Sequence, residues 1–300
     1  MGEHDVREIT ITKMLDAPVD LVFRAWTEAE HLARWWGPEG FTVPSAECDA
    51  REGGALRIVM RAPDGQDFPM TGTFREVDPP RRLVIASEAL GDGGERLLEA
   101  VTTVSFVDHD GKCELTVHER GVALTPEAVA MLAGMELGMV QSLRKLDDLL
   151  TGAIDRQMAL TRMLPAPVER VFEAWTAPEH LERWWGPDGF TTTTQEIDIR
   201  PGGVWRFTMH GPDGVEYPNV IAFEEIVPNE RLVYLHTSPD DEDPSFRTTV
   251  TFDGFAGMTV LTMKGVFDRP EDLALVIEKY DALQGGNQHL DRMVAYVTEG

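Results

Sequence analysis

The pattern of apolar and polar positions predicts the same series of elements twice along the chain. Alternation predicts a first strand at residues 7–14, and apolar residues at helical spacing after Pro18 predict a short helix. A second short helix follows and ends at Gly37-Pro38. Six more strands separated by turn residues, and then a long amphipathic helix, are predicted at 42–51, 55–62, 68–77, 82–89, 99–108, 112–120 and 125–150.

The second half of the chain repeats the first in sequence as well as in pattern. The segment AWTEAEHLARWWGPEGFT, which begins at Ala25, returns as AWTAPEHLERWWGPDGFT at Ala174, an offset of 174 − 25 = 149 residues. A repeat of this length is a whole domain. We therefore expect two α+β domains, residues 1–152 and 153–300, with the second closed by a long helix at 270–297. Because the linker at 151–155 is short, we also expect the domains to touch within a monomer of pseudo-two-fold character.

Composition narrows the classes of partner. The 300-residue chain has 27 basic and 52 acidic residues, and its net charge of −25 disfavours nucleic acid and membrane surfaces as partners. Both cysteines, Cys48 and Cys113, lie in the first copy, so we expect reduced thiols and a cytoplasmic protein. The acidic N-terminal residues lack the basic-then-apolar pattern of a signal peptide and no apolar run reaches about 18 residues, so we expect neither a signal peptide nor a membrane span. No Cys/His set fits zinc and no Gly-rich loop follows a strand, so we expect no metal and no cofactor.

A family resemblance rests on two motifs that both copies carry. The phrase WWGPxGF occurs at Trp35 and Trp184, and Asp-x-Arg-x-Gly-Gly follows at Asp49 and Asp198. With the order of elements, these motifs resemble the domain homologous to the activator of heat-shock-protein-90 ATPase, a member of the START-like (SRPBCC) superfamily. The resemblance covers nearly the whole chain, twice. It implies a helix-grip fold like that of the birch-pollen allergen, in which a curved antiparallel sheet wraps a long C-terminal helix around a cavity. Members of the superfamily include co-chaperones in stress responses, carriers of lipids and small molecules, and cyclase-like enzymes.

Strand alternation identifies candidate ligand-binding residues on the inner face of each sheet. For the second copy the candidates are Trp184, Trp205, Phe207, Met209, Tyr217, Asn219, Phe223, Tyr234 and His236. For the first copy they are Trp35, Met60, Phe68, Met70 and Phe74. The second set is more aromatic and more polar, which indicates the richer site. We therefore expect one or both domains to bind a small hydrophobic molecule without a defined reaction.

Several alternatives stay open at the level of sequence. The same residues fit a simpler interpretation as core, and the paired tryptophans fit either a cavity roof or a staple between helix and sheet. An enzyme of the cyclase or hydrolase kind would use His236 with Tyr234. A co-chaperone-like module would bind a protein partner through an acidic face. The acidic run at 240–243 has no Ca²⁺-loop spacing and is interpreted as a solvated loop.

Overall fold

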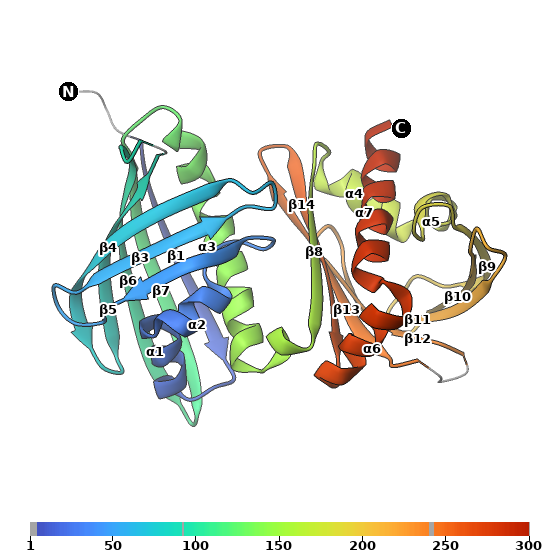
Figure 1. Cartoon of the computed structure of the whole chain (residues 1–300), viewed down its shortest axis with the longest axis horizontal. Coiled ribbons are helices and arrows are strands. Elements are labelled where there is room, and N and C mark those ends of the chain that lie inside the picture. The colour runs from blue at the N-terminus through green and yellow to red at the C-terminus, as the bar shows by residue number, and fades with distance from the viewer. Residues whose placement is uncertain (1–4, 92, 240–242, 300) are drawn as a thin grey trace. The chain divides into compact units, whose positions relative to one another are not determined.

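The chain divides into two compact units, residues 1–154 and 155–300. The computed structural model describes residues 5–91, 93–239 and 243–299 (Figure 1). The first unit consists of β1 (Val6–Leu15), α1 (Val19–Thr27), α2 (Ala29–Trp35), β2 (Thr42–Cys48), β3 (Ala55–Arg61), β4 (Asp67–Asp78), β5 (Arg82–Leu90), β6 (Arg96–His109), β7 (Lys112–Ala123) and α3 (Ala128–Leu150). The short 3₁₀-helix η1 (Ala153–Asp155) follows it.

The second unit repeats this order with one change at its end. Its elements are β8 (Gln157–Leu164), α4 (Val168–Thr176), α5 (Pro178–Trp184), β9 (Thr191–Ile197), β10 (Val204–His210), β11 (Glu216–Val227), β12 (Arg231–Thr237), β13 (Phe246–Phe255), β14 (Met258–Phe267), α6 (Pro270–Tyr280) and α7 (Ala282–Glu299). The single helix expected at 270–297 is therefore wrong. The chain breaks it at Asp281, whose φ of 49° is left-handed and ends α6.

Each unit contains one seven-stranded antiparallel sheet. The first sheet has the order β1-β7-β6-β5-β4-β3-β2 and the second has β8-β14-β13-β12-β11-β10-β9. In each sheet the first strand in sequence pairs with the last one. The remaining strands pair with their neighbours in sequence. This arrangement confirms the α+β class and the order of elements expected from the sequence.

The helices cover one face of each sheet and complete a separate core. In the first unit α3 packs against β1, β6 and β7, while α1 and α2 lie at one end of it (Figure 1). The period-two pattern predicted this inward face correctly, since Leu56, Ile58 and Phe74 are fully buried. A proline directly precedes the first helix of each unit, Pro18 before α1 and Pro167 before α4. The Pro18 carbonyl accepts hydrogen bonds from the N–H groups of Leu21 and Val22.

The part of the chain that the structure describes contains no helix that is both long and apolar enough to cross a membrane.

Candidate functional site

A cavity of about 170 Å³ lies inside the first unit, between the inner face of the sheet and α3. Its walls come from the loop after α2, from strands β3 to β7 and from α3. The lining residues are Trp35, Trp36, Gly37, Pro38, Leu56, Met60, Met70, Ile85, Ser87, Thr102, Glu119, Met135, Gly138, Met139 and Ser142. Most of this surface is apolar, and four thioethers contribute to it.

Glu119 on β7 is the one titratable side chain among the lining residues. Its strand neighbour on β6 is Thr102, whose hydroxyl donates a hydrogen bond to the Glu119 carboxyl group. Burial raises the pKa of Glu119 to about 7, and the hydrogen bond from Thr102 opposes part of that rise. Glu119 keeps some accessible surface because it faces the cavity. No basic side chain among the described residues pairs with it.

The WWGP phrase forms one wall of the cavity, and a helix cation holds it in place. Nζ of Lys145 on α3 lies 3.3, 3.2, 3.4 and 3.1 Å from the carbonyl oxygens of Trp36, Gly37, Pro38 and Phe41. Gly37 turns the chain with a φ of 87°, which side chains rarely adopt. The loop is thus built to present its backbone to one ammonium group.

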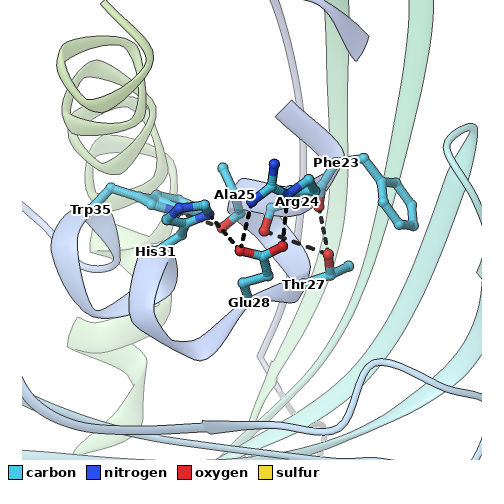
Figure 2. A network of polar contacts seen from close by, with 7 residues as sticks. All are labelled: Phe23, Arg24, Ala25, Thr27, Glu28, His31 and Trp35. Atoms are coloured by element: carbon cyan, nitrogen blue, oxygen red, sulfur yellow. Dashed lines mark hydrogen bonds and ion pairs between the residues drawn. The ribbon is translucent and has the colours of Figure 1, made fainter. Parts of the chain in front are cut away.

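Trp35 is anchored between the two short helices. Its indole N–H donates a 2.9 Å hydrogen bond to the carbonyl oxygen of Ala25. Figure 2 shows this bond beside the ion pair of Arg24 with Glu28, whose carboxylate also lies 3.3 Å from Nδ1 of His31. The second unit repeats the anchor, with Trp184 donating to Ala174 at 3.0 Å. The tryptophan therefore both joins the helices and lines the cavity.

Packing in the second unit fills the space that corresponds to Glu119. In the strand register, Glu119 lies opposite Ile9 and Thr102. Gly265 lies opposite Met158 and Thr248, which occupy the same places in the second sheet. The Phe246 ring lies against Gly265, because a Cβ there would be 3.1 Å from the ring carbon Cδ2. At the position of Phe246 the first unit has Ala100, by the same register. The exchange of two residues replaces an acidic group by an aromatic ring.

The interior of the second unit instead holds the buried His289 and the half-buried His236. Nε2 of His236 lies 2.8 Å from Oδ1 of Asn219, and Nδ1 of His289 accepts a 3.0 Å hydrogen bond from the Gly186 N–H. Burial lowers the pKa of His236 to about 4 and that of His289 to about 3. Burial also raises the pKa of the Tyr234 hydroxyl, to which Thr248 is hydrogen-bonded. All three groups are neutral near pH 7.

The candidate residues from the sequence fall into two groups. Trp35, Met60 and Met70 line the cavity together, whereas Phe74 is in the core and Phe68 packs on Phe41. Most candidates of the second copy lie in its core or pack against it, with Trp205 and Phe207 stacked at 4.1 Å, and the half-buried Asn219 and His236 contact each other. Tyr217 packs on Phe190 at 5.7 Å. A ligand-binding role for the second group stays a prediction.

Sequence reasoning missed Glu119 and His289. A signal for Glu119 was present, because it follows Leu115 and Val117 at period two on an inward-facing strand. His289 lies three residues before Arg292, which holds the loop of the second unit. Ser142 lies three residues before Lys145, which holds the loop of the first unit, so His289 and Ser142 occupy matching positions. Alignment of the two C-terminal helices would have revealed it.

The acidic groups near the Asp-x-Arg-x-Gly-Gly motif and in the acidic run lie outside the cavity. Glu47 and Asp49 form exposed ion pairs with Arg57 and Arg51. Of the acidic run at 240–243, residues 240–242 lie outside the described residues. Asp243 accepts hydrogen bonds from Lys279 and Tyr280.

Comparison with known proteins places both units in one family. The family model for "Activator of Hsp90 ATPase homolog 1-like protein" matches residues 16–151 and again 165–298. No curated protein matches the chain. Similar solved structures include one from Chromobacterium violaceum, with 28% identity over 47% of this chain and 96% of that one, at a TM-score of 0.41.

Two further structures are similar to about half of the chain. One is described as the AHSA1 protein from Silicibacter pomeroyi, with 25% identity, 48% of this chain and 98% of that chain covered, and a TM-score of 0.42. The other is a protein from Arthrobacter aurescens, with 24% identity, 49% and 88% coverage and a TM-score of 0.46. Since the family model matches most of the chain, in two segments, this chain belongs to the family of Activator of Hsp90 ATPase homolog 1-like proteins, with two domains of that family in tandem.

Proposed function

We propose that the first domain binds a small, mostly apolar molecule in the cavity between its sheet and α3. The observation that carries this proposal is the cavity of about 170 Å³, whose lining is mostly apolar. An apolar cavity of roughly 150 Å³ is large enough for benzene. A ligand of about six to nine non-hydrogen atoms therefore matches the volume.

The comparison between the two domains supports an asymmetric division of labour. At matched positions the second domain replaces Glu119 and Ala100 by Gly265 and Phe246, and it places the Phe246 ring where the carboxyl group would lie. It also replaces Ser142 by His289, which the Gly186 N–H and three indole rings enclose. In this proposal the second domain contributes to the stability of the chain, and the first domain supplies the ligand-binding site.

Toluene is a suitable probe, because it matches the cavity in size and has no polar group. At pH 5.5, where Glu119 is protonated, toluene should bind the full chain saturably at one site. In a chain labelled with ¹³C at the methionine methyl groups, the shifted signals should be those of Met60, Met70, Met135 and Met139, out of 13 methionines.

The matched variant transfers the packing of the second domain into the first. Ala100→Phe combined with Glu119→Gly should abolish toluene binding, whereas Arg57→Gln on the outward face of β3 should leave it unchanged. Binding that persists in the double variant, or methyl shifts away from the four methionines, would place the site elsewhere. The labelling experiment uses the unmodified chain, so it holds even if the double variant fails to fold.

A further inference from the structure

The cavity contains a carboxyl group without a cationic partner. Glu119 is half-buried at the wall, one hydroxyl group donates to it, and no basic side chain among residues 5–91, 93–239 and 243–299 pairs with it. An ionised carboxylate in such a place is unstable unless something compensates its charge. Lys145, the cation on the same helix as Met139, is engaged by the carbonyl groups of the WWGP loop.

The other walls of the cavity suit a positive charge on an apolar body. The indoles of Trp35 and Trp36 lie 5.2 Å apart at an interplanar angle of 52°, and both line the cavity. Indole rings attract organic cations, and thioethers are polarisable and adapt to irregular shapes. The lining offers no basic group that would hold an anion. These features together favour a cation over an anionic ligand.

We propose that the ligand of the first domain is a small organic ammonium ion, whose charged group pairs with Glu119 and whose apolar body lies among the methionines and tryptophans. This inference rests on the proposed function of the same cavity. It also implies a difference between the domains, because Gly265 gives the second domain no carboxylate at the matching position. The first domain alone should recognise the cation.

Three probes of nearly equal size separate the ammonium inference from the proposed function: benzylammonium, toluene and benzoate. We expect the full chain at pH 8 to bind benzylammonium at least about tenfold more tightly than toluene, because a hydrogen bond between two charged groups contributes more to affinity than apolar contact at the same place. Benzoate should bind more weakly than both. Binding is measured by titration calorimetry, with competition against benzylammonium for the weaker probes.

Glu119→Gln is the matched variant, because the amide keeps the shape of the side chain and can still accept the bond from Thr102. It should reduce the preference for benzylammonium over toluene to within about twofold. Between pH 6 and pH 8 the affinity of the unmodified chain for benzylammonium should rise about tenfold as Glu119 ionises, and that of the variant should not change.

The outcomes distinguish the two proposals. If toluene at pH 8 binds as tightly as benzylammonium, or benzoate binds most tightly, the ammonium inference is wrong while the cavity remains a binding site. If Glu119→Gln folds and keeps the full preference for the cation, the pairing with Glu119 is wrong. If neither benzylammonium at pH 8 nor toluene at pH 5.5 binds, both proposals are overturned.

Discussion

The backbone N–H of Gly186 donates a 3.0 Å hydrogen bond to Nδ1 of His289. In a neutral imidazole this bond places the proton on Nε2. Protonation of Nδ1 would leave two donors facing each other inside the domain. The turn of the second WWGP phrase is thus tied to a histidine that must stay neutral.

We predict that mild acid destabilises the second domain. Folding lowers the pKa of His236 and His289 below the usual value of 6.5, so the unfolded chain binds protons that the folded domain does not bind. Stability is full above pH 6.5 and is lost as the pH falls towards 4 and 3. By pH 5 the loss should be about 2 kcal/mol per histidine.

Hydrogen exchange of the full chain at pH 7 and pH 5 checks this for each domain separately, after correction for the intrinsic exchange rate. His289→Gln, which can still accept the bond from Gly186, should reduce the pH dependence of the second domain. His118→Gln, at an exposed histidine of the first domain, serves as the control. Equal acid sensitivity in His289→Gln and in the unmodified chain would refute the assignment.

For Glu119 we predict the opposite pH dependence. Folding raises the pKa of this carboxyl from 4.5 to about 7, so its favourable contribution is present below pH 4.5 and is lost as the pH rises through 7. Glu119→Gln should therefore stabilise the first domain by about 3 kcal/mol at pH 8 and by about 1 kcal/mol at pH 5. Urea unfolding at both pH values measures the difference. Glu114→Gln on the same strand, at a half-exposed carboxyl group, should show no such gain.

The loop-holding cations should be interchangeable but not dispensable. Arg292 donates to the carbonyl oxygens of Gly186, Pro187 and Phe190, as Lys145 does to the corresponding loop. Lys145→Met should cost about 2–4 kcal/mol, because several part-buried carbonyl groups lose a charged donor. Arg292→Lys should cost less than about 1 kcal/mol. Lys112→Met, which removes an exposed ion pair with Asp16, is the control in urea unfolding. If Lys145→Met lowers the free energy of unfolding no more than this control does, Lys145 does not hold the loop in place.

Removal of the Phe246 ring should open a cavity in the second domain. Because Phe246 is half-buried, Phe246→Ala is expected to lower the free energy of unfolding by less than the about 3–5 kcal/mol that truncation of a fully buried aromatic costs. Toluene should restore part of the loss, and benzylammonium should restore no more than toluene, since Gly265 supplies no carboxylate. Thermal unfolding with each probe tests this. A preference of this variant for the cation would count against Glu119 as the source of selectivity.

The order of elements and the inward faces followed from the sequence because two copies agreed on both. Leu56, Ile58 and Met60 alternate along β3, and all three lie on the inner face, as the period of two predicts. Alternation does not tell whether the space in front of a face is filled. The larger residues of the second copy indicated a richer site, yet Phe207 lies in the core and the Phe246 ring packs against Gly265. Likewise, no proline marks the helix break at Asp281, so spacing alone could not reveal it.

The exchange of residues between the two interiors also affects how a tandem repeat folds. Adjacent domains of similar sequence are prone to exchange strands while they fold. A Cβ on Gly121 of β7 would lie 2.7 Å from Cδ1 of Leu132 and 2.9 Å from the sulfur of Met135, and β14 carries Phe267 at this position. If β14 replaced β7, a benzyl group would enter space that α3 already occupies. The divergence between the two interiors thus also disfavours pairing of β14 with the first sheet.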